Sequence, residues 1–398
     1  MPGLDVPGLD TLDLEGKRVL IRVDFNVPLD EHGRITDDTR IRAAVPTLRE
    51  VLRRGGGPVL MSHLGRPQGR VVESLRMDPV ALRLSEALGR PVLKLEGSSG
   101  REVEAAVRDT PPKTTVLLEN VRFHPGETRG DPKLGAAYAL LGDVFVNDAF
   151  GTSHRDHASV CGPARHLPAA AGLLLQREIE AFRRVLEAPE KPFVLVLGGA
   201  KVADKLPVVG NLIERVDTIV VGGGMAYTFL VAGGRGVGTS LVDEEQLDRV
   251  RSTLEQAAAT GCTILLPVDH VVAERFAADA PASVVAEIPA GTMALDIGPR
   301  TRALYAETIA PARTVVWNGP MGVFEWDSFR AGTEAVGRAV AACPGYTVVG
   351  GGDSVAAIGL LGLEGEIGHV STGGGASLEL LAGRALPGIE VLAPKVGA

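Results

Sequence analysis

Polar and basic side chains follow four short apolar runs in the first half of the chain. The runs cover residues 19–23, 59–62, 116–118 and 144–146, and carboxylate, amide, imidazole or guanidinium groups come after each of them. The residues concerned are Asp24, Asn26, Arg40, His63, Arg66, Arg122 and Arg155. The planar fork of an arginine suits a carboxylate or a phosphate, so these groups could converge on one small anion. A solvated surface position is the better interpretation of any single arginine, and the recurrence weakens it.

Glycine takes the place of arginine after the apolar runs of the second half. Five runs there, the last at 369–370, end in loops that contain one to three glycines. Residues in these loops include Gly198, Gly199, Gly222, Gly223, Asn318, Gly319, Gly351, Gly352 and Ser354. Bare backbone lets phosphates and a flat base approach closely, and Lys201 and Lys205 add point charges. One such loop is ordinary turn chemistry, because glycine adopts positive φ freely, but their number favours a nucleotide site.

The stretch 371–381 joins a glycine run directly to a helical pattern. Leu378 and the apolar residues one turn further on share a helix face, and Gly383 supplies a stop. A helix that starts in glycine presents unshielded backbone N–H groups and the positive end of its dipole, which suit a phosphate. We therefore expect Gly373 and Gly374 to offer N–H groups to a phosphate, with a flexible turn as the alternative.

Asp353 follows Gly352 and precedes a helical pattern that contains Val355 and Ile358. Its carboxylate could contact Mg²⁺ through nucleotide phosphates or could simply cap the helix, and the sequence leaves both open. The usual nucleotide motifs are missing: there is no Gly-x4-Gly-Lys-Ser/Thr loop and no clean Gly-x-Gly-x-x-Gly with an acidic ribose partner. Two kinds of anion site still favour phosphoryl transfer, which needs positioning and charge neutralisation more than a nucleophilic side chain.

The elements that must position these groups alternate short apolar runs with longer helical patterns. This alternation is typical of an α/β fold, with parallel sheets covered by helices and ligands at the carboxyl ends of the strands. The 398 residues exceed one ordinary core and favour two domains. Leu175, Ile179, Phe182 and Leu186 predict an amphipathic helix of about 15 residues between the halves. It could hold two domains apart or be an ordinary crossover helix.

The composition predicts a globular protein without nucleic acid or membrane partners. Net charge is −8 and the basic residues are scattered, which argues against nucleic acid or an anionic membrane. The three widely spaced cysteines indicate neither a disulfide framework nor a zinc cluster, so a reducing compartment fits best. No apolar run approaches the ~20 residues of a membrane span, and the N-terminus lacks a signal-like apolar core. We expect a cytoplasmic protein.

Eight motifs, in order along nearly the whole chain, resemble those of phosphoglycerate kinases. Those of the first half are Arg-Val-Asp-Phe-Asn-Val-Pro at 22–28, Ser-His-Leu-Gly-Arg-Pro at 62–67 and Leu-Glu-Asn-Val-Arg-Phe at 118–123. Those of the second half are Gly-Gly-Ala-Lys-Val-Ala-Asp-Lys at 198–205, Gly-Gly-Gly-Met-Ala at 222–226, Trp-Asn-Gly-Pro-Met-Gly-Val-Phe-Glu at 317–325, Gly-Gly-Gly-Asp-Ser at 350–354 and Ser-Thr-Gly-Gly-Gly-Ala-Ser at 371–377. The resemblance implies reversible phosphoryl transfer from 1,3-bisphosphoglycerate to ADP, giving 3-phosphoglycerate and ATP with Mg²⁺ in glycolysis.

The resemblance also implies residue roles. The phosphoglycerate would be held by Asp24, Phe25, Asn26, Arg40, His63, Leu64, Gly65, Arg66, Arg122 and Arg155. The nucleotide would be held by Lys201, Lys205, Gly222, Gly223, Ala294, Asn318, Glu325, Gly351, Gly352, Asp353 and Ser354. Within that set, Asp353 would contact the metal and Glu325 the ribose. The phosphoryl group in transit would meet Arg40, Lys201, Lys205, Gly373 and Gly374.

The family fold implies two Rossmann-like domains joined by a long interdomain helix and hinge. The corresponding bounds here are 1–173 for a phosphoglycerate-binding domain, 174–188 for the helix, 189–383 for a nucleotide-binding domain and 384–398 for a tail returning to the first domain. The tail has little helical period and could pack as irregular chain. Hinge closure would exclude water from the acyl phosphate, and the family is usually monomeric.

Departures from the family pattern are few. Ala294 stands where many relatives have glycine, and Ser153 and Asp156 stand where alanine is frequent. No charged site residue is lost. A non-catalytic nucleotide-binding protein of the same fold, or a kinase for another carboxylate, is the alternative function.

Overall fold

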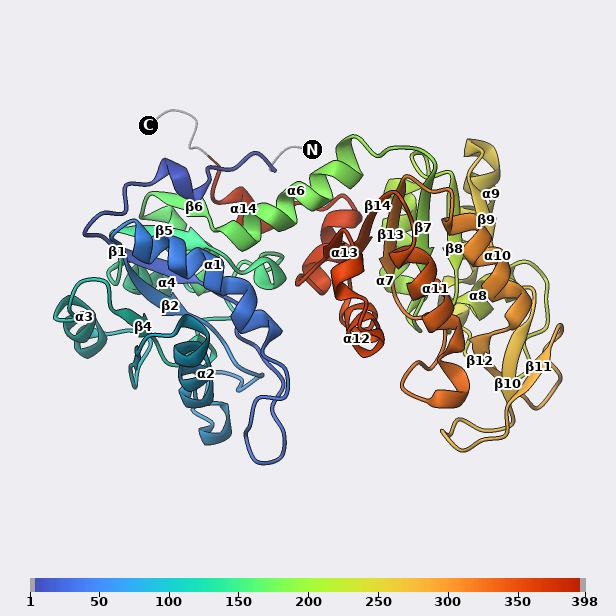
Figure 1. The fold of residues 1–398 in the computed structure, drawn as a ribbon, viewed down its shortest axis with the longest axis horizontal. Coiled ribbons are helices and arrows are strands. Elements are labelled where there is room, and N and C mark those ends of the chain that lie inside the picture. The colour runs from blue at the N-terminus through green and yellow to red at the C-terminus, as the bar shows by residue number, and fades with distance from the viewer. Residues whose placement is uncertain (1–3, 394–398) are drawn as a thin grey trace. The chain divides into compact units, whose positions relative to one another are not determined.

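The computed structural model describes residues 4–393, which divide into two units (Figure 1). The first unit contains the chain as far as Glu180 together with the segment from Ala385 onward, and the second is Ala181–Arg384. The ends of the predicted first domain and of the predicted tail, residues 1–3 and 394–398, lie outside the described residues.

The first unit is built on a parallel sheet of six strands within the described residues, in the order β3-β4-β2-β1-β5-β6. The strands are β1 (Arg18–Arg22), β2 (Gly57–Met61), β3 (Val92–Lys94), β4 (Thr115–Leu117), β5 (Val144–Asn147) and β6 (Ala169–Ala171). The helices are α1 (Thr39–Arg53), α2 (Asp78–Leu88), α3 (Arg101–Arg108), α4 (Pro132–Ala139), α5 (Ala158–Cys161) and α14 (Pro387–Glu390). Short 3₁₀ turns are η1 (Leu9–Thr11), η2 (Glu73–Leu75), η3 (Val121–Phe123), η4 (Phe150–Thr152) and η5 (Pro163–Arg165).

Strand β1 shows why both faces of this sheet need helices. Val19 and Ile21 point into a hydrophobic cluster formed with α1 and α2, whereas Leu20, also fully buried, alternates to the other face. A strand buried on both faces is hydrophobic throughout, as parallel sheets require. Arg22 is the exception at its carboxyl end, where its guanidinium is buried as well.

The second unit repeats this plan with a sheet in the order β15-β14-β13-β7-β8-β9, again with parallel pairings. Its strands are β7 (Phe193–Leu197), β8 (Thr218–Val221), β9 (Thr263–Leu265), β13 (Thr314–Asn318), β14 (Tyr346–Val349) and β15 (His369–Val370). The helices are α7 (Val202–Leu212), α8 (Met225–Ala232), α9 (Leu247–Thr260), α10 (Pro299–Ile309), α11 (Ala331–Ala341), α12 (Gly352–Leu361) and α13 (Gly375–Leu381). The 3₁₀ turns are η6 (Glu244–Gln246), η7 (Asp327–Phe329) and η8 (Glu364–Glu366). The predicted α/β class, with two parallel sheets flanked by helices, is confirmed.

A small antiparallel sheet in the second unit was not predicted. It consists of β10 (His270–Ala273), β11 (Ser283–Val285) and β12 (Met293–Ile297) in the order β11-β10-β12. Its apolar runs are short and are separated by loops rather than by helical patterns, so the alternating pattern of the chain does not reveal it. Ala294 lies on β12, buried, and its N–H donates to Oγ of Ser240 at 3.0 Å.

The amphipathic helix predicted between the halves is α6 (Leu173–Glu187), which crosses the boundary between the two units in the chain. All four residues that predicted it are buried. Asp148, which follows β5, caps its first turn: Oδ1 accepts from the N–H groups of Leu174 at 2.9 Å and Leu175 at 3.2 Å. Burial raises the pKa of Asp148 to about 6 against these hydrogen bonds.

Two predicted helix starts need correction. Helix α13 begins at Gly375 rather than at Gly373, because the backbone of its N-cap Gly374 is not helical, with φ of 51° and ψ of −112°. The Gly373 N–H donates to Oγ of Ser371 at 3.1 Å. Its fully buried face includes Leu380, whereas Leu378 is half-buried. Asp353 lies inside the first turn of α12, whose N-cap is Gly351, so the simple capping alternative for Asp353 is wrong. Gly383 ends α13 with φ of 77°, as predicted.

The tail after residue 384 returns to the first unit. It is not irregular throughout, since it forms the short helix α14. The Gly388 N–H donates to the carbonyl of Ser153 at 2.8 Å, and Nδ2 of Asn147 donates to the carbonyl of Gly388 at 2.7 Å. A Cβ on Gly388 would lie 2.6 Å from Val160, so only glycine fits this close approach. None of the helices in residues 4–393 combines the length and apolar character needed to cross a bilayer.

Candidate functional site

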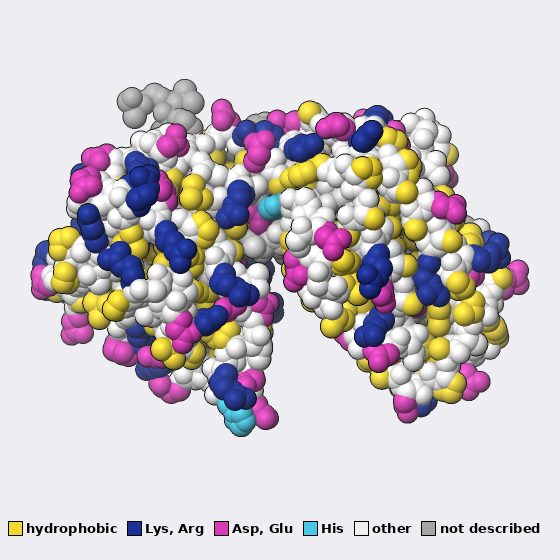
Figure 2. Space-filling model, viewed as in Figure 1, with side chains coloured by type: hydrophobic (Ala, Val, Ile, Leu, Met, Phe, Trp, Pro, Cys, Tyr) yellow, Lys and Arg dark blue, Asp and Glu magenta, His cyan; other side chains and the backbone are white. Residues whose placement is uncertain are grey.

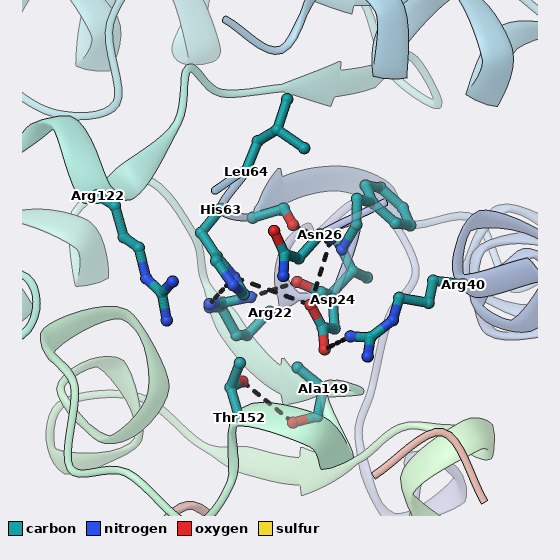
Figure 3. Close-up of polar contacts among 12 residues, drawn as sticks. Arg22, Asp24, Asn26, Arg40, His63, Leu64, Arg122, Ala149 and Thr152 are labelled. Carbon is teal, nitrogen blue, oxygen red and sulfur yellow. Dashed lines mark hydrogen bonds and ion pairs between the residues drawn. The ribbon is translucent and has the colours of Figure 1, made fainter. Parts of the chain in front are cut away.

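The sheet order of the first unit reverses at β1, which pairs with β2 on one side and with β5 on the other. Such a reversal separates the loops that leave the strands and opens a ligand crevice at their carboxyl ends. Five of the predicted side chains converge there from different segments, as the close-up in Figure 3 shows. They are Asp24, Asn26, Arg40, His63 and Arg122.

Arg22, the last residue of β1, lies fully buried at the centre of this cluster. Its Nη2 is 3.2 Å from Nδ1 of His63. Because a guanidinium can only donate, Nδ1 must accept, and the ring proton of His63 is on Nε2. Burial lowers the pKa of His63 well below its ordinary value, and the charge of Arg22 reinforces this against the opposing effect of Asp24. His63 is therefore a neutral hydrogen-bond donor near pH 7.

Asp24 is the acidic member of the cluster. Its Oδ2 forms an ion pair with Nη1 of Arg40, and its Oδ1 is 3.8 Å from Nδ1 of His63. Burial would raise the pKa of Asp24, but the charges of Arg40 and Arg22 outweigh burial and hold this pKa below its usual range. Arg40, in the first turn of α1, is thus fixed by a carboxylate that stays ionised at neutral pH.

Arg122 supplies a donor that the protein does not use. Its Nη1 donates to the carbonyl of Gly65 at 2.9 Å, and its backbone N–H donates to Oδ1 of Asn120 at 3.1 Å. Its buried Nε has no hydrogen-bond partner among the described residues. Burial lowers the pKa of Arg122 to about 10, and Arg22 and Arg155 add to this effect. A buried cationic donor without a partner is costly unless a ligand satisfies it.

Two buried charges in this region were missed by the sequence analysis, namely Arg22 and Glu127. Oγ of Ser159 links them, since it accepts from Nε of Arg22 at 2.8 Å and donates to Oε1 of Glu127 at 2.6 Å. Burial raises the pKa of Glu127, against the effect of Arg22. An arginine inside the apolar run 19–23 was the available signal for Arg22, whereas nothing local marks Glu127.

The other predicted residues of the first unit have different surroundings. Phe25 is buried and its N–H donates to Oγ of Ser62 at 2.8 Å. Leu64 is buried beside Gly65, whose N–H donates to Oδ1 of Asn26 at 2.8 Å. Arg66 and Arg155 are exposed.

The second unit has the equivalent reversal at β7, which pairs with β13 and β8. Here the crevice loops pack backbone against backbone. A Cβ on Gly319, whose φ is 102°, would overlap the carbonyl group of Gly198, and the Gly199 N–H donates to the Pro320 carbonyl at 2.8 Å. Only glycine fits at such a contact, because both its φ and the space exclude a side chain.

Gly222 and Gly223 lie in the same packing. The Gly222 N–H donates to Leu197 at 2.8 Å and the Gly223 N–H to Met321 at 3.0 Å, and side-chain space at both is filled by protein atoms. The expectation of bare backbone open to a ligand is therefore wrong at these two glycines. Gly352, by contrast, has open space beside its backbone, because a Cβ there would have no neighbour within 4 Å.

Lys205 is the buried cation of this region. Its Nζ donates to Oδ1 of Asn318, and burial lowers the pKa of Lys205 to about 8 against the charges of Asp204 and Asp353. Nδ2 of Asn318 is buried and has no partner among the described residues. The side chain of Ser354 makes a hydrogen bond within the protein, because its Oγ accepts from the Gly319 N–H at 2.6 Å.

The remaining predicted residues of the second unit are mostly exposed. Lys201, Asp353 and Glu325 are exposed, and Gly374 has φ of 51° with open space where a Cβ would lie. Within residues 4–393 no group of three or more His, Cys, Asp or Glu side chains could hold a metal ion. A lone exposed carboxylate fits Mg²⁺ that is bound chiefly through substrate phosphates, which is how this ion is commonly held.

Charge is mixed on the surface shown in Figure 2, where Lys and Arg side chains alternate with Asp and Glu over both units. Basic groups are not gathered into a stripe on this face. The concentrated positive charge of the first unit is instead the buried strand-end cluster in Figure 3.

The phosphoglycerate kinase family model matches residues 9–384. The chain belongs to the phosphoglycerate kinase family. A phosphoglycerate kinase of Moorella thermoacetica is 57% identical over 389 residues, which cover 97% of this chain and 99% of the relative. One of Roseiflexus castenholzii is 54% identical over 385 residues, covering 96% and 97%. The solved phosphoglycerate kinase of Coxiella burnetii is 41% identical with a TM-score of 0.87, covering 98% of this chain and 99% of that one.

The phosphoglycerate kinase reaction is therefore the activity of this chain, and the non-catalytic alternative is not favoured. The reaction transfers the acyl phosphoryl group of 1,3-bisphosphoglycerate to ADP, giving 3-phosphoglycerate and ATP in glycolysis.

Proposed function

We propose that the strand-end cluster of the first unit binds the phosphoglycerate and that the strand-end loops of the second unit bind the nucleotide. The observation that carries the proposal is the buried, unpartnered Nε of Arg122 beside the buried Arg22. The charges of Asp24 and Glu127 oppose those of Arg22, Arg40, Arg122 and Arg155, so the cluster keeps a positive excess. A small substrate with a carboxylate and a phosphate would complete it.

The same residues fit the chemistry without a general base. The phosphoryl acceptor in the direction of 1,3-bisphosphoglycerate formation is a carboxylate, which is already ionised at neutral pH. His63, neutral and protonated on Nε2, acts as a donor to the substrate and not as a proton acceptor. Arg40, held by Asp24, is placed to stabilise negative charge on the group in transit.

On the nucleotide side, the proposal assigns Lys205 to the phosphates and Glu325 to the ribose. Gly351–Ser354 would present the N-terminus of α12 to phosphate, with Lys201, Gly373 and Gly374 contacting the transferred group. Residues Gly222, Gly223, Ala294 and Asn318 would shape the same pocket. Asp353 would hold Mg²⁺, which supplies charge neutralisation at the nucleotide phosphates when it is bound.

The domain roles, the hinge and the cellular setting belong to the same proposal. Direct transfer requires the two substrates to meet, so we propose closure of the units about the α6 segment, with water excluded. We also propose a cytoplasmic monomer, which size-exclusion chromatography with light scattering would test.

The experiment compares Arg122→Ala with Arg90→Ala, an exposed arginine of the same unit. Titration calorimetry should show 3-phosphoglycerate affinity at least tenfold weaker in Arg122→Ala, with ATP affinity unchanged. Arg90→Ala should bind both as the wild type does. Unchanged 3-phosphoglycerate affinity in Arg122→Ala would refute the proposed substrate site.

A further inference from the structure

Asn120 follows β4 in the motif at 118–123, and the roles assigned so far do not include it. Its side chain is fully buried. Nδ2 donates to the carbonyls of Leu64 at 2.8 Å and Leu75 at 2.9 Å, and Oδ1 accepts from the Arg122 N–H at 3.1 Å. Every polar atom of this amide is therefore used, and its partners come from three segments of the chain.

Two of these hydrogen bonds act on a single peptide unit. The carbonyl of Leu64 and the N–H of Gly65 belong to the same planar amide. Asn120 donates to its carbonyl end, and Oδ1 of Asn26 accepts from its N–H end at 2.8 Å. Because the plane is held from both ends, the Asn26 amide is oriented too: Oδ1 is committed to the backbone, so its NH₂ is the group left for other contacts.

The next peptide, between residues 65 and 66, is held by Arg122. The carbonyl of Gly65 accepts from Nη1 of Arg122 at 2.9 Å, and the backbone N–H of the same arginine donates to Asn120. Gly65 itself has φ of 63°, and a Cβ there would lie 2.8 Å from the side chain of Leu75. A rotation of the 64–65 peptide would therefore break the contacts to Asn26 and Asn120 together, while the Arg122 guanidinium holds the adjoining 65–66 peptide. In Figure 3, Leu64 lies above His63 and Asn26, and Arg122 lies to their left.

We propose that Asn120 is a positioning residue for phosphoglycerate binding, which acts by fixing the 64–65 peptide, and through it the Asn26 amide, and by holding the backbone of Arg122. Asn120 does not contact the substrate in this proposal. The inference rests on the proposed assignment of Asn26 and Arg122 to the phosphoglycerate.

The chain offers a matched control in Asn147. This asparagine is the last residue of β5 in the same unit and is also fully buried. Its Oδ1 accepts from the N–H two residues on, that of Ala149, at 3.1 Å, just as Asn120 accepts from Arg122. Its Nδ2 donates to Ser153 at 3.1 Å and to Gly388 of the tail at 2.7 Å, and neither of these residues is assigned to the phosphoglycerate. Loss of either amide removes three hydrogen bonds.

The test compares Asn120→Ser with Asn147→Ser in the full-length enzyme, since both changes are neutral in charge. Steady-state assays give kcat and the KM for 3-phosphoglycerate and for ATP, and thermal unfolding gives stability. We expect Asn120→Ser to raise the KM for 3-phosphoglycerate on the order of 10- to 100-fold, with kcat and the KM for ATP within about threefold of wild type. Asn147→Ser should lose comparable stability and leave both KM values unchanged.

A structural role alone would lower the fraction of active enzyme and leave the KM values as they are. The inference is overturned when Asn120→Ser leaves the KM for 3-phosphoglycerate unchanged, or when Asn147→Ser raises it equally. If Asn120→Ser is unfolded, Asn120→Asp keeps the shape and is compared with Asn147→Asp. Arg122→Ala distinguishes failure of the inference from failure of the proposed site. If Arg122→Ala raises the KM for 3-phosphoglycerate and Asn120→Ser does not, only the inference is refuted. If Arg122→Ala leaves that KM unchanged, the proposed site is refuted as well.

Discussion

The two strand-order reversals, at β1 and at β7, each occur at the first strand of a parallel six-stranded sheet and are filled in opposite ways. At β1 the loops carry buried charged side chains. Arg22 and Glu127 are fully buried, and the side chain of Asp24 is 10% exposed. At β7 the loops carry glycines whose backbones touch, and Lys205 is the buried cation. The two sheets therefore place different groups at their reversals, namely charged side chains at β1 and close-packed glycine backbone at β7.

On the proposed assignment of phosphoglycerate to the first unit and nucleotide to the second, the difference follows from the sizes of the ligands. A three-carbon phosphate ester offers few atoms, so discrimination requires forked, oriented donors that are already paired with acidic partners before it binds. A nucleoside phosphate is long, and close approach of main-chain N–H groups requires small residues. The first site should therefore be sensitive to loss of a charge, and the second to addition of a methyl group.

The largest effect should come from Arg40→Ala. This change removes the guanidinium that Asp24 orients and takes away the main positive charge that opposes the burial of the Asp24 carboxylate. Turnover should fall roughly 10²- to 10³-fold, while ATP affinity changes little. Arg42→Ala on the same helix is the control, because Arg42 is exposed and forms its ion pair at 2.8 Å with Asp38 and not with Asp24. Stopped assays and ATP titration measure both quantities, and unchanged turnover would remove Arg40 from the transfer site.

A methyl group should be the damaging change in the second unit. Gly319→Ala forces a Cβ into the Gly198 backbone at φ of 102°, so we expect about 2–4 kcal/mol lower free energy of unfolding. Gly210→Ala, in α7 with no atom within 4 Å of the added Cβ, should instead stabilise by about 0.4–1 kcal/mol. Urea unfolding of both variants checks this contrast, and equal effects would contradict the steric account.

The sequence predicted the residues that stand directly after strands and missed those whose partners are distant. Asp24, His63 and Arg122 were accessible because each follows an apolar run. Glu127 reaches Arg22 through Ser159, and no local pattern encodes a contact between segments so far apart. At Gly222 and Gly223 the residue type was read correctly as a need for bare backbone, but the atoms that require it belong to the protein. A glycine in the sequence indicates that there is no room for a side chain, but it does not indicate which atoms occupy that space.

The pH dependence should also separate the two regions. Lys205, with pKa of about 8, loses its charge as pH rises from 7 to 9, so ATP affinity should fall, approaching tenfold per pH unit above the pKa. Folding responds with the opposite sign: above pH 8 the unfolded chain binds more protons at this lysine, so its contribution to stability rises. His63 and Asp24 have lowered pKa values and do not titrate there. Affinity for 3-phosphoglycerate should be flat across this window, and Lys205→Met should abolish the ATP trend.

The smallest effects are expected at the two departures beside Arg155, and they differ because burial differs. Ser153 is fully buried: its Oγ accepts from Asn147 at 3.1 Å and donates to Ala149 at 3.0 Å. Ser153→Ala should cost about 1 kcal/mol, since Asn147 keeps its bond to the tail carbonyl of Gly388. Asp156 pairs with Arg165 at 2.9 Å in solvent, so Asp156→Ala should cost at most about 0.5 kcal/mol, and less in high salt. Neither should alter the KM for 3-phosphoglycerate. If Asp156→Ala proved the costlier change, then burial would not be what decides the value of polar contacts near this charged cluster.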